Sequence, residues 1–161
     1  TLNAPNGLII DAGALSYTNK IQSQNNKNLI LTPHPGEAGT LLGISAEEVQ
    51  FNREESAIAI ANKYNASAVI LKGYNTLVHI KGEHETFICK DGGPELATGG
   101  TGDVLAGIIS ALLAQNLSLK ESCLLAVASH AKAGEKFVDY IGEIGLNASS
   151  LIPRVRKILN K

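Results

Sequence analysis

The sequence predicts an α/β fold in which a mostly parallel sheet is extended by a β-hairpin and covered by C-terminal helices. Over the first 72 residues, short apolar segments alternate with helical segments, which is typical of parallel strands joined by helical crossovers. Two later apolar segments flank the turn Lys81-Gly82-Glu83 and indicate antiparallel pairing. From residue 103 onwards, apolar residues recur at helical spacing.

The first strand is expected at residues 7–11 (GLIID), an apolar segment that ends in the carboxylate of Asp11. A short helix should follow over residues 12–22, and residues 28–32 (NLILT) predict the second strand. Two prolines then interrupt the chain in TPHPGE, before a short helix expected over residues 37–42. Because proline fixes the backbone, the imidazole of His34 should project from a rigid loop.

Ser45 and Glu48 have the spacing of a capping box, so helical structure should begin there and continue to Tyr64. The middle of the chain then predicts the remaining strands and a Gly/Thr-rich loop. These are a third buried strand at residues 68–71, hairpin strands at 77–80 and 86–89, and the loop at 94–102.

Three helices should close the chain and cover one face of the sheet. The strongest prediction is residues 103–115, where Leu105, Ile109 and Leu112 belong to one apolar stripe. The others are residues 121–141 and residues 151–159, where Pro153 suits a first helical turn. No internal repeat or linker is visible, so residues 1–161 should belong to one domain.

The composition excludes several classes of protein. The chain has 161 residues, of which 44% are hydrophobic, and a formal net charge of −1. This apolar content excludes a disordered chain, and no apolar run reaches the roughly 18 residues that a membrane span needs. The near-zero charge argues against nucleic acid as a partner. Cys89 and Cys123 lack metal-like spacing and are expected to be free thiols in the cytoplasm.

The most informative segment is TGGTGD at residues 98–103, directly before the long amphipathic helix. A helix start offers free backbone N–H groups and a positive dipole end, and glycines allow an anion to approach closely. Gly100, Thr101 and Gly102 therefore form a candidate anion hole for phosphate. Asp103 would be repelled by that phosphate, unless it acts as a base on a hydroxyl beside it. The alternative is a glycine-rich turn in which Asp103 is an ordinary residue of the first helical turn.

Three motifs in this order resemble the bacterial ADP-dependent NAD(P)H-hydrate dehydratases of the ribokinase-like superfamily. They are TPHPGE (residues 32–37), LKGYNT (residues 71–76) and ATGGTGDVLAG (residues 97–107). The last motif alone indicates the superfamily, whereas the first selects the dehydratases. The resemblance extends from Asp11 to Pro153 and implies a ribokinase-like three-layer fold.

The resemblance also implies that residues 1–161 are the C-terminal portion of one dehydratase domain. The family has a substantial N-terminal portion before the segment that reads DAGAL here at residues 11–15. That portion contributes the first strands and part of the substrate pocket, and it is expected to be missing from this sequence. The family commonly has a second Asp where Gly13 stands, so any contact of that carboxylate is in doubt.

The implied reaction restores NADH or NADPH from its hydrated form. ADP (or ATP), with Mg²⁺, phosphorylates the hydroxyl on the reduced nicotinamide ring, and phosphate then leaves as the double bond returns. Asp103 would take the hydroxyl proton, and the N–H groups of Gly100, Thr101 and Gly102 would hold the transferring phosphoryl group. A kinase-like site suits a dehydration because phosphate is a better leaving group than hydroxide.

By resemblance, His34 and Asp103 contact the hydrated dinucleotide. Glu37 is expected either to cap a helix or to help hold Mg²⁺ or water, and no residue is assigned as a metal ligand. The adenine nucleotide site is expected to contain Lys72, Gly73, Tyr74, Asn75, Thr76 and Gly102. The alternative for Lys72 is a surface lysine at the entry of the hairpin.

The other histidines are given structural roles. His79 and His84 are expected at the surface, and His130 as a packing residue of an Ala-rich helix. By family, the protein should be a cytoplasmic homo-oligomer, a tetramer, with a possible upstream epimerase domain. Two other functions stay open from the residues: a small-molecule kinase acting on a vitamin-precursor alcohol, and a non-catalytic nucleotide-binding fragment.

Overall fold

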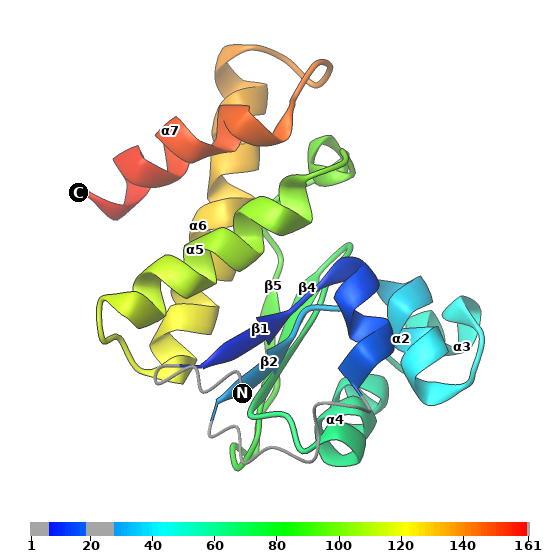
Figure 1. Cartoon of the computed structure of the whole chain (residues 1–161). Coiled ribbons are helices and arrows are strands. Elements are labelled where there is room, and N and C mark those ends of the chain that lie inside the picture. Colours follow the sequence, from blue (N-terminus) through cyan, green and yellow to red (C-terminus); the bar gives the residue numbers. More distant parts are fainter. Residues whose placement is uncertain (1–6, 19–27, 161) are drawn as a thin grey trace.

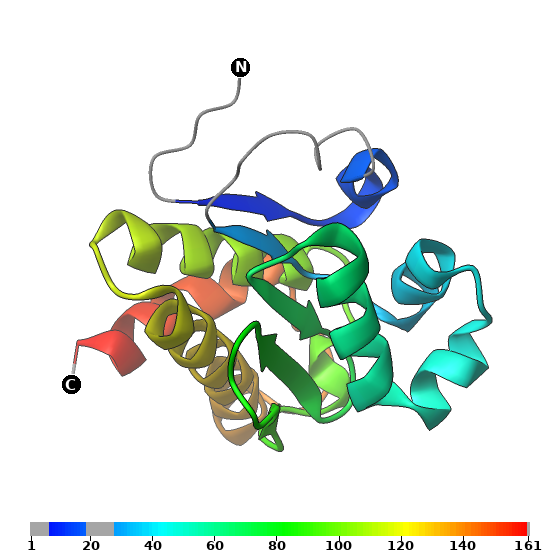
Figure 2. The same ribbon diagram turned by 90° about the horizontal axis from the view of Figure 1, so that it is seen from below.

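The structure, a computed structural model, describes residues 7–18 and 28–160. Among these residues, five strands form one mixed sheet in the order β1-β2-β3-β4-β5, with helices on both faces (Figures 1 and 2). The parallel strands are β1 (Leu8–Ile10), β2 (Leu29–Leu31) and β3 (Ala68–Leu71). The antiparallel strands are β4 (Thr76–Ile80) and β5 (Phe87–Cys89). The predicted mixed sheet and its hairpin are confirmed.

The parallel register decides where the functional loops lie. Ile10 is paired with Leu31, and Leu31 with Val69. The three strands therefore end at the same edge of the sheet, and the residues that follow them lie side by side. In open α/β sheets this carboxyl edge is where ligands bind.

One face of the sheet is covered by α5 (Thr101–Ala114) and α6 (Leu119–Tyr140). Ile30 and Ile70 share a buried cluster with Leu105 and Ile109 of α5. The last helix, α7 (Ala148–Leu159), packs on α5 and α6, on the side away from the sheet (Figure 1). The prediction that all three helices cover the sheet is therefore wrong for α7, whose apolar side meets two helices.

On the opposite face, α4 (Arg53–Tyr64) packs directly on the sheet, the 3₁₀ helix η1 (Ala12–Tyr17) and α2 (Pro35–Leu42) lie on the same side, and α3 (Ala46–Phe51) packs on α2 and α4. Its buried cluster joins Leu31, Val69 and Leu71 to helix residues such as Ile60. Neighbouring strand residues point to opposite faces, so each central strand contributes to both clusters.

Several helix boundaries differ from the sequence-based expectations. The helix predicted over residues 12–22 is the 3₁₀ helix Ala12–Tyr17, and the last predicted residues lie outside the described part of the chain. The capping box of Ser45 and Glu48 is present, but the helical region breaks at Asn52 into α3 and α4. The predicted loop at residues 94–102 contains a short 3₁₀ helix, η2 (Pro94–Leu96), and its last two residues already belong to α5.

Two residue placements are corrected. Pro153 lies inside α7 rather than in its first turn, because Asn147 caps the helix through Ser150 and so starts it earlier. His79 is buried, because it lies within β4 rather than in the exposed turn of the hairpin. His84 lies in that turn and is exposed, as expected. Cys89 and Cys123 are both free thiols.

Two further features bear on function. Within residues 7–18 and 28–160, none of the helices combines the length and the apolar character that crossing a membrane requires. The same residues contain no group of three or more His, Cys, Asp or Glu side chains that could hold a metal ion.

Candidate functional site

The ends of the parallel strands bring three charged side chains together. Lys72, directly after β3, places its Nζ 2.5 Å from Oδ1 of Asp11, directly after β1. The same Nζ lies 3.8 Å from Oε2 of Glu37 in α2. These side chains lie beside Gly102 in the first turn of α5, where an added Cβ would be 3.2 Å from the Lys72 Nζ. The second and third sequence motifs therefore meet at one point.

The first turn of α5 has the backbone geometry of an anion hole. Gly100 is its N-cap in the left-handed region (φ 88°), and no side chain caps the helix. The starts of α2, α3, α6 and α7 are capped by side chains, whereas α4, like α5, has no side-chain cap. Oγ1 of Thr101 lies 2.8 Å from the carbonyl oxygens of Leu96 and Thr98, which fixes the loop before the helix. The positive end of α5 is thus held in place, and no capping side chain accepts hydrogen bonds from its first backbone N–H groups.

A cavity of about 370 Å³ lies on one side of this turn. Lys72, Gly73, Tyr74 and Thr76 line it together with Thr101 and Gly102 of α5, so the expected nucleotide motif and the expected anion hole share one cavity. Its other walls are the loop that begins at Asp91 and the facing side of α6. These walls are formed by Asp91, Gly92, Gly93, Pro94, Leu96, Ala97, Leu105, Val127, His130 and Ala131.

Two of the residues expected in the nucleotide site and the anion hole do not line this cavity. Asn75 adopts a left-handed conformation (φ 55°) and turns its carbonyl oxygen to Arg53. Gly100 forms the cap of α5 outside the cavity lining, and a Cβ added to it would lie 3.1 Å from the Cβ of Ala148. Both residues set the course of the backbone next to the cavity and do not line the cavity themselves.

His130 fixes α6 to the anion hole. Its Nε2 lies 2.9 Å from the carbonyl oxygen of Thr101. Burial lowers the pKa of the imidazole, and the hydrogen bond to Thr101 opposes this shift only in part, so the neutral form is favoured. The predicted packing role is confirmed, but no local pattern indicated that this residue also lines the cavity.

His34 and Glu37 form a reciprocal cap at the start of α2. The Nδ1 of His34 accepts hydrogen bonds from the backbone of Gly36 (3.1 Å) and Glu37 (3.2 Å), and the Glu37 carboxylate accepts one from the backbone of His34 (2.7 Å). The expected capping role of Glu37 is therefore present. The imidazole of His34 is exposed, as expected of a side chain that projects from this loop, and these bonds hold its ring at the helix start.

The cap also determines which nitrogen of His34 can reach a ligand. Since Nδ1 is an acceptor, the proton of the neutral ring is on Nε2. That nitrogen lies 3.4 Å from Oε1 of Glu37. The side chain is 56% exposed, so a ligand can reach the ring edge that carries Nε2.

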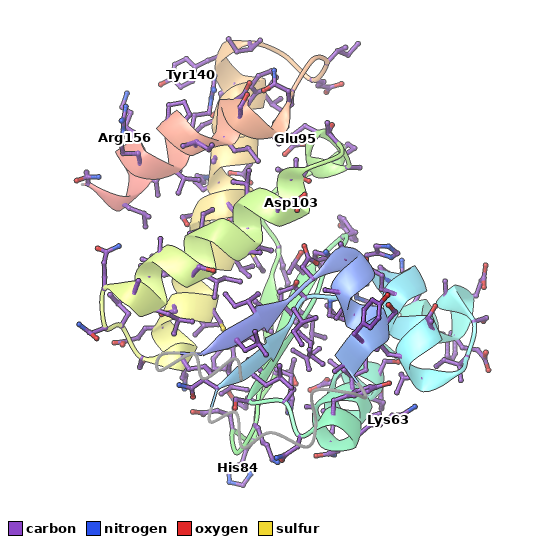
Figure 3. All side chains as sticks on the ribbon, in the orientation of Figure 1. Lys63, His84, Glu95, Asp103, Tyr140 and Arg156 are labelled. Atoms are coloured by element: carbon purple, nitrogen blue, oxygen red, sulfur yellow. The ribbon has the colours of Figure 1, made fainter. Side chains whose placement is uncertain are left out.

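Asp103 lies on a different side of the α5 turn from the 370 Å³ cavity. It is exposed and begins a groove of about 800 Å³ that runs along α5 to α7. Figure 3 shows Asp103 near the N-terminal end of α5, above the end of β1, with Glu95 in the neighbouring loop and His84 at the far end of the molecule. The first turn of α5 thus separates the nucleotide-sized cavity from the carboxylate expected to act as base.

Sequence reasoning missed Asp11, which it treated only as the end of a strand. Burial raises the pKa of the Asp11 carboxyl, but hydrogen bonds from Lys72 and Thr32 and the charge of Lys72 outweigh it and hold the pKa below its ordinary value. Its side chain is only 13% exposed. The one available signal was a charged residue directly after an apolar strand, the position at which parallel sheets place ligand contacts.

We expect Asp11→Asn to lower the free energy of unfolding at pH 7 by about 1–3 kcal/mol, because the Lys72 ammonium loses its nearest carboxylate and retains, among the described residues, only that of Glu37, 3.8 Å away. A carboxyl whose pKa is lowered by folding stabilises the protein above its unfolded pKa of about 4, and this contribution is lost as the pH falls. Urea unfolding of both proteins at pH 7 and near pH 3 measures the effect. The difference in the free energy of unfolding between the two proteins should be large at pH 7 and small at pH 3. An equal difference at both pH values would contradict this role of the Asp11 carboxylate.

Comparison with known proteins supports the resemblance seen in the motifs. The sequence model of a family described as NAD(P)H-hydrate dehydratase matches residues 1–157. The bifunctional NAD(P)H-hydrate repair enzyme Nnr of Coxiella burnetii is 42% identical over 153 residues, covering 94% of this chain and 30% of that protein. The ADP-dependent (S)-NAD(P)H-hydrate dehydratase of Neisseria meningitidis is 36% identical over 160 residues, covering 96% of this chain and 53% of that protein. The chain therefore spans about half the length of this dehydratase relative.

Solved structures give the same picture. The ADP/ATP-dependent NAD(P)H-hydrate dehydratase from Bacillus subtilis, co-crystallised with ATP/Mg²⁺ and soaked with CoA, has a TM-score of 0.84 and 30% identity, covering 96% of this chain and 56% of that one. A ribokinase-like superfamily protein from Enterococcus faecalis has a TM-score of 0.78 and 26% identity, covering 96% of this chain and 52% of that one. The predicted ribokinase-like fold is confirmed.

Proposed function

Since this chain belongs to the NAD(P)H-hydrate dehydratase family, we propose that the protein dehydrates hydrated NADH or NADPH with ADP or ATP as phosphoryl donor. One observation supports this most. The first turn of α5 lies between the cavity that Lys72 lines and the exposed carboxylate of Asp103. Donor and acceptor could then meet at the N–H groups of that turn.

In the proposed reaction, the nucleotide lies in the 370 Å³ cavity with its terminal phosphate at the start of α5. Asp103 accepts the proton of the ring hydroxyl as the hydroxyl oxygen bonds to phosphorus, and the bond to the remaining nucleotide breaks. Lys72 and the N–H groups of Thr101 and Gly102 stabilise the charge on the phosphoryl oxygens. Phosphate then leaves with its bonding electrons, the neighbouring ring carbon loses a proton, and the double bond returns.

Mg²⁺, which neutralises phosphate charge during phosphoryl transfer, fits the site as an ion carried by the nucleotide. Mg²⁺ retains water and is commonly bound by substrate phosphates with one or two carboxylates. The nearby carboxylates of Asp11 and Glu37 are both engaged, the first by Lys72 and the second by the cap of α2. The nucleotide phosphates and water would therefore supply most of the ligands.

We expect Asp103→Asn to keep the fold and nucleotide binding but to lower turnover by about 10²–10⁴, the usual cost of removing a positioned base. Recovery of NADH absorbance from hydrated NADH with ADP measures it. Asp139→Asn, a matched change at an exposed carboxylate of α6, should retain wild-type turnover. Turnover of Asp103→Asn within a few-fold of wild type would remove this residue from the mechanism. A stable phosphoester product in the wild-type reaction would favour a small-molecule kinase instead.

We expect Lys72→Ala to weaken ADP binding by about 10–100-fold, because a charge-assisted contact to phosphate is lost, and to weaken dinucleotide binding less. Calorimetric titration with ADP tests this. Lys120→Met, at a surface lysine paired with Glu83, is the control. Unchanged ADP affinity together with weaker dinucleotide binding would assign Lys72 to the other subsite.

The catalytic domain is proposed to include further polypeptide, corresponding to the part of the relatives that this chain does not match. Two neighbouring surfaces support this. Among the described strands, β1 is an edge strand that pairs only with β2, and its residues are apolar. An unpaired edge of an apolar strand can pair with a further strand. Next to it, the groove along α5 and α7 is lined by apolar side chains, and Ile152 in it is 57% exposed. A strand beside β1 and a helix in this groove would cover both.

The isolated 161-residue chain should therefore melt at a lower temperature and turn over more slowly than a version extended upstream, while partial ADP binding persists because Lys72 and the anion hole are present. Thermal melts and turnover of both versions test this. Equal stability and equal turnover would show that this chain needs no further polypeptide.

The cytoplasmic location, the tetrameric assembly and the upstream epimerase domain stay predictions from the resemblance. Light scattering of the purified full-length protein would test the assembly directly.

A further inference from the structure

One arginine holds both ends of the loop that carries Lys72. Nη2 of Arg53, the first residue of α4, lies 3.0 Å from the carbonyl oxygen of Leu71, 3.4 Å from that of Lys72 and 3.5 Å from that of Asn75. Nη1 donates to Oε1 of Gln50 at 2.5 Å, which fixes the guanidinium. The contacts therefore span the loop from its entry to its exit.

The loop backbone needs such support. β3 and β4 are antiparallel, with Leu71 opposite Leu77, so the chain reverses within residues 72–76. Gly73 (φ 119°) and Asn75 (φ 55°) are both in the left-handed region, which costs an asparagine conformational energy. A Cβ added to Gly73 would lie 3.6 Å from Nη1 of Arg53, so the guanidinium lies directly against the turn.

Arg53 carries a charge that this part of the structure does not neutralise. In residues 7–18 and 28–160, no carboxylate forms an ion pair with it, and the loop carbonyls and Gln50 are its hydrogen-bond partners. The side chain is partly buried, and desolvation lowers the pKa of the guanidinium. The guanidinium is therefore held by uncharged acceptors, and the cavity lined by the same loop is the one proposed to hold phosphate.

We propose that Arg53 is a positioning residue for nucleotide binding. It does not line the cavity, but it fixes the backbone of residues 72–76 so that Lys72 starts from the correct place to reach both Asp11 and the phosphate. This inference rests on the proposed function, because it takes the cavity to be the nucleotide site. The guanidinium is suited to the role because its rigid fork reaches several acceptors at once, which a lysine ammonium at this position would do less well.

The test compares Arg53→Met and Arg53→Lys with the wild type in the full-length protein. We expect Arg53→Met to raise the KM for ADP about tenfold or more, as expected for loss of hydrogen bonds from a charged group. The kcat at saturating ADP and the KM for hydrated NADH should stay within a few-fold of wild type. Arg53→Lys retains the charge and one donor group, and should raise the KM for ADP by a smaller factor. Amide hydrogen exchange should become faster in residues 72–76.

Arg154→Met is the matched control, since Arg154 is also partly buried and donates to a backbone carbonyl, that of Ser150, but in α7. It should leave the KM for ADP unchanged. A KM for ADP within twofold of wild type in a folded Arg53→Met protein would overturn the inference. An equal loss in kcat and in both KM values would also overturn it, because it would indicate general destabilisation. If Arg53→Met does not fold, Arg53→Lys decides by the same measurements.

A failure of this inference can be told apart from a failure of the proposed function. If the wild-type protein neither binds ADP nor restores NADH, the proposed function itself fails. If the wild type does both and Arg53→Met matches it, only the role of Arg53 is wrong.

Discussion

Parallel pairing of β1, β2 and β3 is the constraint on which the site depends. It brings the residues after three strands to one edge of the sheet, although Asp11 and Lys72 are 61 positions apart in the chain. The ion pair between these two residues then links β1 to β3 beside the start of α5. A one-residue slip in either pairing would turn the strand side chains to the wrong faces and separate the pair.

The electrostatic balance at this edge explains how carboxylates can lie near a phosphate site. Asp11 is neutralised by Lys72, and Glu37 is engaged by the backbone at the start of α2. The uncapped first turn of α5 contributes positive potential on the cavity side. Asp103 stays exposed on another side of the turn, away from the cavity that is proposed to hold phosphate.

The two helical layers hold this edge by different means. On the α5 side, His130 joins α6 to the first turn of α5 through the carbonyl oxygen of Thr101. On the α4 side, Arg53 joins α4 to the loop after β3 through carbonyl oxygens. Both contacts use backbone carbonyl oxygens as acceptors, so they fix the course of the loops directly. His130 also lines the cavity, whereas Arg53 does not.

The sequence by itself determined the features that depend on local chemistry. Apolar segments specified the strands, Ser45 and Glu48 specified a helix start, and the glycines before Asp103 specified the turn that leads into α5, because each signal lies within a few residues. Lys72 was found through its motif in the same way. Of the predictions that went wrong, the one for Pro153 was also local: a single pattern placed it in a first helical turn, and the capping of α7 by Asn147 overrode that pattern.

Only the tertiary structure decided which side chains meet. The pairing of Lys72 with Asp11, the contact of His130 with Thr101 and the reach of Arg53 to residues 71–75 join segments that are 18 to 61 positions apart. No spacing rule encodes such pairs, since they depend on strand register and on how α4 and α6 pack on the sheet. Asp11 and Arg53 therefore look like an ordinary strand end and an ordinary helix start until the fold places them around the same lysine.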